Sequence, residues 1–173
     1  MLRKIMTAGL AVSFALIADS APGLAEMRQV STVRLHAQAM VNAPPSAIWV
    51  HMTRGKNLIT WCPMWRSAKN ATASLARVGD VLDYSDQWGN GGRSVVTYVI
   101  RNKEIRVAHD PTNGSYMCQA KLILEPQGRG TLVHYWEQYT DESAPKDLQA
   151  TAGKMQSEMD RTLAGLKNEV EKR

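Results

Sequence analysis

The side chains that could move a proton in this sequence are few and scattered. His109 is followed directly by Asp110, and an imidazole beside a carboxylate is a common acid–base pair. Glu137 lies among aromatic and apolar residues, where burial would raise the pKa of its carboxyl group. Tyr98 could donate a hydrogen bond to a carbonyl group. The catalytic residues are therefore unknown from the sequence, with His109, Glu137 and Tyr98 as the candidates.

Other common chemistries have no pattern in this chain. The four histidines, at positions 36, 51, 109 and 134, lack the spacing of metal ligands, so we expect neither a metal nor a cofactor. No nucleophile-elbow motif is present, and a Ser/His/Asp triad cannot be assembled from spacing. The stretch DQWGNGGR, residues 86–93, matches neither the dinucleotide-binding nor the P-loop pattern, and we interpret it as a hairpin loop.

The two cysteines, Cys62 and Cys118, leave two alternatives open. In an oxidising compartment they could form one disulfide. They fall in separate predicted elements, however, and this favours the interpretation that both are buried free thiols.

The first 25 residues have the order of a secretory signal peptide. Arg3 and Lys4 precede an apolar run over residues 8–18, and small residues follow at 23–25. A run of about 11 residues is too short to span a bilayer. We expect cleavage near Ala25, an uncleaved anchor being the alternative, and a single periplasmic or secreted domain over residues 26–173 without stable membrane insertion.

The charge of the chain argues against a nucleic-acid partner. The 173 residues contain 21 basic and 16 acidic side chains, a net charge of +5. The excess is modest and spread along the chain, whereas a nucleic-acid footprint needs basic residues gathered on one face.

Strand patterns and short helices fill the first three quarters of the domain. Residues 30–41 predict a long strand, which Pro44 and Pro45 end, and Pro45 suits the first position of a short helix over 46–52. A second short helix or turn is predicted over 56–61, closed by Pro63. Period-two patterns and glycine-containing turns then predict six further strands, over residues 69–76, 78–84, 94–101, 105–109, 116–125 and 131–139.

The last part of the chain predicts one long helix. From residue 148 the apolar residues recur in steps of three and four, which is the period of one helical face: Leu148, Ala152, Met155, Met159, Leu163, Leu166 and Val170. An antiparallel meander must bury one face, and we expect this helix to be its only cover. The predicted fold class is α+β: a curved antiparallel sheet of about seven strands wrapped around a long C-terminal helix.

Three stretches in this order resemble a known superfamily. They are VNAPPSAIWVHMTRGKNLITWCP (41–63), VGDVLDY (78–84) and GTLVHYWEQY (130–139). Over residues 29–172 the chain resembles the helix-grip fold of the START-related (SRPBCC) superfamily, which includes polyketide cyclase/dehydrase-like proteins and pollen allergens. The resemblance implies a hydrophobic cavity between sheet and long helix that holds lipids, polyketides or steroids. A minority of members are enzymes, and they share no catalytic motif that transfers to this sequence.

Strand alternation predicts which side chains line such a cavity. The last strand is ambiguous: the resemblance favours Tyr135 and Glu137 pointing inward, whereas the opposite register would turn His134 and Trp136 inward. Glu137 at a rim in water is a further alternative. We expect Trp61 and Trp65 to close one end above Trp49. The predicted ligand-binding cavity comprises Trp61, Trp65, Leu82, Tyr84, Tyr98, His109, Cys118, Tyr135, Glu137, Met155 and Met159.

Three functions remain open from the sequence. The first is an exported binding protein for a small hydrophobic or amphipathic molecule, and the second is a cyclase/dehydratase- or isomerase-type enzyme using acid–base residues in the same cavity. The third is an envelope protein-interaction module whose core is filled by side chains. A cavity of roughly 300 Å³ or more would favour binding. A strongly shifted pKa on a His or Glu facing it would favour an enzyme. Ligand identity and oligomeric state are left open.

Overall fold

The structure is a computed structural model that describes residues 31–69, 74–112, 117–141 and 145–172. At Ser31, Asp141 and residues 145–151 it describes the backbone alone. The predicted signal peptide lies outside the described residues.

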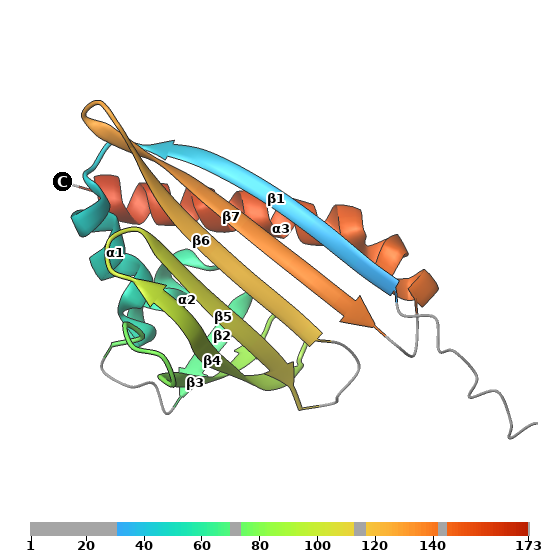
Figure 1. Cartoon of the computed structure of the whole chain (residues 1–173). Coiled ribbons are helices and arrows are strands. Elements are labelled where there is room, and N and C mark those ends of the chain that lie inside the picture. Colours follow the sequence, from blue (N-terminus) through green and yellow to red (C-terminus); the bar gives the residue numbers. More distant parts are fainter. Residues whose placement is uncertain (1–30, 70–73, 113–116, 142–144, 173) are drawn as a thin grey trace, which may run out of the picture.

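Seven antiparallel strands form one curved sheet, and three α-helices pack on its concave side (Figure 1). The strand order is β1-β7-β6-β5-β4-β3-β2, so the first strand pairs with the last and the others form a meander. The elements are β1 (Ser31–Val41), α1 (Pro45–Thr53), the 3₁₀ helix η1 (Gly55–Asn57), α2 (Leu58–Trp61), β2 (Trp65–Lys69), β3 (Val81–Asp86), β4 (Gly91–Ile100), β5 (Glu104–Pro111), β6 (Met117–Gln127), β7 (Gly130–Asp141) and α3 (Pro145–Glu171). This is the helix-grip fold that the sequence predicts.

The short helices begin and end where the prolines predict. Pro44 is the N-cap of α1 and Pro45 its first residue, where the missing N–H costs no helical hydrogen bond. Ile48, Trp49 and Met52 are buried on the inner side of α1.

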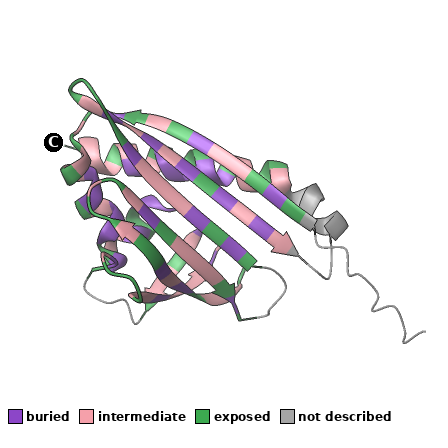
Figure 2. Ribbon diagram, viewed as in Figure 1, coloured by how far each residue is buried: buried purple, intermediate pink, exposed green. Residues whose placement is uncertain are grey.

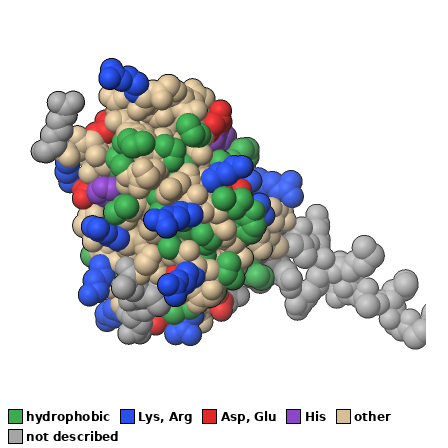
Figure 3. Space-filling view, turned by 60° about the vertical axis from the view of Figure 1, so that its left-hand side comes forward, with side chains coloured by type: hydrophobic (Ala, Val, Ile, Leu, Met, Phe, Trp, Pro, Cys, Tyr) green, Lys and Arg blue, Asp and Glu red, His purple; other side chains and the backbone are tan. Residues whose placement is uncertain are grey.

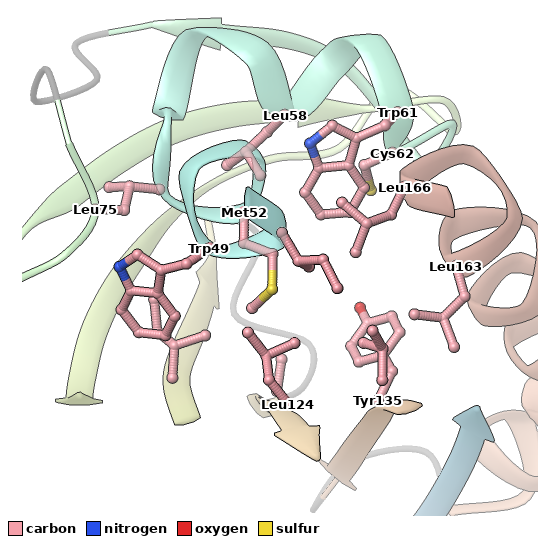
Figure 4. Packing of buried hydrophobic residues seen from close by; sticks show 14 of the residues in the cluster. Trp49, Met52, Leu58, Trp61, Cys62, Leu75, Leu124, Tyr135, Leu163 and Leu166 are labelled. Carbon is pink, nitrogen blue, oxygen red and sulfur yellow. The ribbon is translucent and has the colours of Figure 1, made fainter. Parts of the chain in front are cut away.

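Helix α3 buries the apolar face predicted from its periodicity. Met159, Leu163 and Leu166 are almost completely buried, and Figure 4 shows Leu163 and Leu166 close to Tyr135 and Cys62. The helix packs mainly along β1, however, and lies against α1 and α2 at its C-terminal end. It is therefore not the only cover of the sheet, because α1 and α2 close the part of the concave face over β5 and β6. Burial alternates along the strands, as Figure 2 shows.

The strand predicted over residues 69–76 was misplaced. Strand β2 runs over Trp65–Lys69, directly after Pro63. Residues 74–76 form no strand, and the Leu75 N–H donates to the carbonyl oxygen of Thr53 at 2.7 Å. This segment is therefore hydrogen-bonded to the end of α1, where Leu75 is buried in the core.

The glycine-rich loop is shorter than predicted. Strand β3 continues to Asp86 and β4 already begins at Gly91. One carboxylate oxygen of Asp86 accepts the backbone N–H groups of Trp88 and Asn90, at 2.9 and 2.8 Å. Gly89 supplies the positive φ of 89° that this tight turn needs.

A bulge in β4 reverses the predicted facing of its second half. The register with β5 shifts between Val96 and Tyr98, which leaves Thr97 as the extra residue. Val96 faces the core, but Tyr98, which was predicted to line the cavity, and Ile100 lie on the outer face with 37% and 39% exposure. Val99 packs inward in their place. The placement of Tyr98 in the cavity was therefore wrong, because one inserted residue turns every later side chain to the other face.

Candidate functional site

Two tyrosines and one glutamate of strand β7 point into the interior. Tyr135, Glu137 and Tyr139 are all buried, Glu137 with 4% exposure, whereas Trp136 on the other face is 39% exposed. Pairing with β6 sets Glu137 opposite Ala120, so a small side chain lies beside the carboxyl group. The register favoured by the family resemblance is confirmed, and Glu137 is not a rim residue.

Glu137 is held between two phenol groups. The hydroxyl of Tyr135 donates to its Oε1 and the hydroxyl of Tyr139 to its Oε2. Burial raises the pKa of Glu137, and the two hydrogen bonds act in the opposite direction without reversing it. The carboxyl group therefore keeps its proton at a higher pH than an exposed glutamate does.

His109 on the same inner face carries a half-buried, neutral imidazole. Its Nδ1 lies 2.7 Å from the hydroxyl oxygen of Ser94, and burial lowers its pKa to about 4. The rings of Trp65 and Tyr84 stack on each other with centroids 5.3 Å apart, and each is nearly perpendicular to the ring of His109. The expected pairing of His109 with Asp110 was wrong, because consecutive strand residues face opposite sides and Asp110 is exposed.

Two small cavities adjoin at these residues. The first has a volume of about 70 Å³ and lies beneath α1 and α2, with mostly apolar walls. The second has about 60 Å³ and reaches Glu137, Tyr139 and Met155. Both are bordered by Cys62, Trp65, His109 and Tyr135, so these four side chains form the partition between the two spaces.

Most of the predicted cavity residues border one of these spaces. They are Trp61, Trp65, Tyr84, His109, Cys118, Tyr135, Glu137 and Met155. Leu82 and Met159 are fully buried in the core beside them, and Tyr98 lies outside. Further lining residues were missed, chiefly Met52, Leu58, Leu75, Ser94 and Thr162. Ser94 shares the face of Val96, and Thr162 follows Met159 by one helical turn, so the same periodicity could have found both.

The two cysteines are buried free thiols, as interpreted from the sequence. Burial raises the pKa of Cys62 to about 12 and that of Cys118 well above its usual value. The sulfur of Cys62 lies 3.8 Å from the hydroxyl of Thr162 on α3. Neither thiol is activated as a nucleophile, since that requires a lowered pKa.

Within the part of the chain that the structure describes, no group of three or more His, Cys, Asp or Glu side chains is arranged to hold a metal ion. None of the helices in the same residues has both the length and the apolar character needed to cross a membrane. In the space-filling view, Lys and Arg side chains alternate with exposed hydrophobic ones (Figure 3).

Comparisons with known proteins support this architecture. A sequence model of the family described as "Polyketide cyclase / dehydrase and lipid transport" matches residues 32–171. No curated protein sequence matches the chain.

Solved structures with this fold are numerous. A protein from Rhizobium leguminosarum superposes with a TM-score of 0.66 at 13% identity, over 84% of this chain and 98% of that one. Truncated norcoclaurine synthase from Thalictrum flavum gives 0.66 at 11% identity, over 83% and 96%. The Aha1 dimer from Colwellia psychrerythraea gives 0.60 at 21% identity, over 80% and 96%. At these identities the likeness shows a shared fold alone.

Proposed function

This chain belongs to the polyketide cyclase/dehydrase and lipid transport family, and we propose that it binds a small hydrophobic or amphipathic molecule between its sheet and its helices. One observation carries the proposal: the apolar interior is interrupted on one wall by the Tyr135–Glu137–Tyr139 group. Ligand sites of this kind combine apolar walls with a few placed polar groups that fix orientation. A ligand oxygen or nitrogen would meet Glu137 while its apolar body lies against Leu122, Ile105 and Met52.

The size of the interior limits how such a ligand enters. Together the two cavities fall well below the roughly 300 Å³ of a typical small-molecule site. Binding therefore requires the partition between them to move. Trp65 is the part of the partition best suited to this, because it lies on β2 at the edge of the sheet and is only half-buried. Rotation of its side chain away from Tyr84 would join the two spaces.

A cyclase/dehydratase- or isomerase-type enzyme is the second candidate. The observation that favours it is the pair of shifted groups at one cavity: a Glu137 with a raised pKa and a His109 whose pKa is lowered to about 4. Such opposed shifts are typical of residues that hold and accept protons at neutral pH. Glu137 would donate a proton to a ligand carbonyl, and neutral His109 would accept one.

Export is a separate part of the proposal and has its own test. The order of charged, apolar and small residues over 1–25 supports it. Intact-mass measurement of the protein secreted from its source should give a chain that begins near Glu26. A full-length mass would contradict cleavage.

Native mass spectrometry tests ligand binding directly. Protein purified from its source should carry a non-covalent adduct that organic extraction releases. Ala120→Met should remove the adduct, because Ala120 borders the first cavity and the longer side chain would fill it. Ala108→Met is the matched control, since Ala108 lies on the opposite face of the neighbouring strand.

A third variant keeps the test decisive if overpacking prevents Ala120→Met from folding. Trp65→Ala should join the cavities and retain the adduct. A protein without any adduct in its wild-type and Trp65→Ala forms would support the filled-core interaction module instead. Release of a chemically altered compound after incubation with extracted ligand would identify an enzyme.

A further inference from the structure

A hollow lies on the outer face of the sheet, away from the helices. It has a volume of about 270 Å³ and crosses strands β1, β7, β6, β5 and β4. Its polar side chains and one exposed aromatic ring are Arg34, Thr97, Arg106, Gln119, Lys121, Gln138 and Trp136. We call this group the outer-face site. It is separate from the interior cavities because these side chains point away from the core.

Cross-strand pairing aligns five side chains in one row through the site. His36 pairs with Trp136, Trp136 with Lys121, Lys121 with Arg106, and Arg106 with Tyr98. The row therefore places two cations next to each other, with an aromatic ring beyond each. The bulge at Thr97 is what brings Tyr98 into the row, since it turns that ring outward.

The two cations are each held by the neighbouring ring. The Lys121 ammonium lies 5.4 Å from the centre of the Trp136 ring, and the Arg106 guanidinium lies 4.6 Å from that of Tyr98. Such contacts are attractive and restrain both side chains over the sheet. Like charges directly opposite each other on paired strands are destabilising, so this arrangement costs stability in the absence of an anion.

The charge of the site remains positive after its neighbours are included. Arg106 pairs with Glu104 at 2.6 Å, while Arg34 donates to the neutral amide oxygen of Gln138 at 3.1 Å. Glu137 borders the hollow, but its side chain faces the interior between two tyrosines. The site therefore contains three cationic side chains, Arg34, Arg106 and Lys121. The carboxylate of Glu104 compensates only one of these charges, that of Arg106.

One histidine, His36, lies at the end of the row beside Trp136. The pKa of His36 is lowered, first by burial and then by the charges of His134 and Lys121. His134 itself lies 3.2 Å from a carboxylate oxygen of Glu125, beyond the end of the hollow.

We infer that the outer-face site binds a phosphate group. Arg34, Arg106 and Lys121 would supply the charge, and the amides of Gln119 and Gln138 with the hydroxyl of Thr97 would supply further donors. A phosphate group presents its acceptor oxygens to several donors at once, and a phosphate monoester also carries more negative charge than a single carboxylate, so a phosphate suits this set better. Trp136 would contact the organic part of a phosphate ester. The phosphate group can belong to a soluble compound or to a lipid headgroup.

NMR titration of the full chain with inorganic phosphate tests the inference. The indole signal of Trp136 and the side-chain amide signals of Gln119 and Gln138 should shift saturably, and more than with chloride at equal ionic strength. Lys121→Gln combined with Arg34→Gln should weaken phosphate binding about tenfold or more. Lys103→Gln combined with Arg129→Gln removes the same charge at two exposed hairpin turns and should change it less than about twofold.

Sedimentation with phosphatidylglycerol vesicles, against phosphatidylcholine vesicles, separates the two sources. Binding to phosphatidylglycerol that is lost in the Lys121/Arg34 variant and kept in the control assigns a lipid headgroup. Phosphate binding without vesicle binding assigns a soluble phosphate compound. Both variants should unfold at the same urea concentration as the wild type or a higher one. The inference is overturned if neither probe binds, or if the control variant loses as much affinity as the Lys121/Arg34 variant.

Discussion

Gly165 of α3 lies directly against the backbone of Trp61 at the end of α2. A Cβ atom at Gly165 would overlap the carbonyl oxygen of Trp61 and would come within 3.1 Å of its carbonyl carbon. The absence of a side chain therefore allows the long helix to pass this close to the short one. This contact sets the position of Trp61, which forms part of the wall of the first cavity.

Replacement of this glycine should be costly. Gly165→Ala should lower the free energy of unfolding by about 1–3 kcal/mol, because backbone atoms cannot move aside as a flexible side chain can. Gly153→Ala is the matched control on the same helix, where an added Cβ meets no atom within 4 Å. That change should raise stability by about 0.5–1 kcal/mol through the higher helix propensity of alanine. Urea unfolding measures both, and equal effects would rule out the close contact.

Removal of α3 should unfold the domain. Deletion of residues 146–173 would expose the part of the sheet that α3 covers and the partners of Met159, Leu163 and Leu166. Urea titration followed by circular dichroism should then show no cooperative transition. As the control, a chain that lacks just the last two residues, Lys172 and Arg173, should unfold as the wild type does. A soluble, cooperatively folding truncate would show that α1 and α2 suffice as a cover.

Glu137→Gln should change how stability depends on pH. The folded pKa of Glu137 is raised above its ordinary value of 4.5, so the folded state holds a proton that the unfolded state has already lost. The contribution of Glu137 to wild-type stability should therefore fall as the pH rises from about 4.5 towards the folded pKa, by on the order of 1 kcal/mol per pH unit. Glu137→Gln should remove this fall, and the exposed Glu125→Gln should not. Urea unfolding at several pH values measures the slopes, and identical wild-type and Glu137→Gln profiles would argue against a protonated Glu137.

His109 should make stability depend on pH in the opposite direction to Glu137, over a pH range that overlaps with that of Glu137. The folded pKa of His109 is lowered to about 4 from an ordinary value of 6.5, so the unfolded state binds a proton first as the pH falls. This group should therefore lower stability between about pH 6.5 and 4, and His109→Gln should remove that loss. Direct NMR titration of the imidazole is the second measurement. An imidazole that titrates near 6.5 in the folded protein would contradict its burial.

The predictable parts of the structure follow from local spacing. The face of α3 could be predicted because apolar residues at steps of three and four lie on one side of any α-helix, whatever it packs against. The start of α1 could be predicted because Pro45 fits a first helical turn. For most strands, alternation predicted the inner side chains, including His109 and Cys118.

The sequence by itself determined the order of elements, the apolar face of α3 and the family resemblance, because each is written in residue types at short and regular spacing. Only the tertiary structure decided three further features: the inward register of Glu137, the outward position of Tyr98, and the small divided cavity. Each depends on contacts between segments distant in the sequence. Features that arise where separate elements fit together leave no periodic signal in the sequence. They include the one-residue bulge in β4, the approach of Gly165 to Trp61, and the pairing of β7 with β1 and β6.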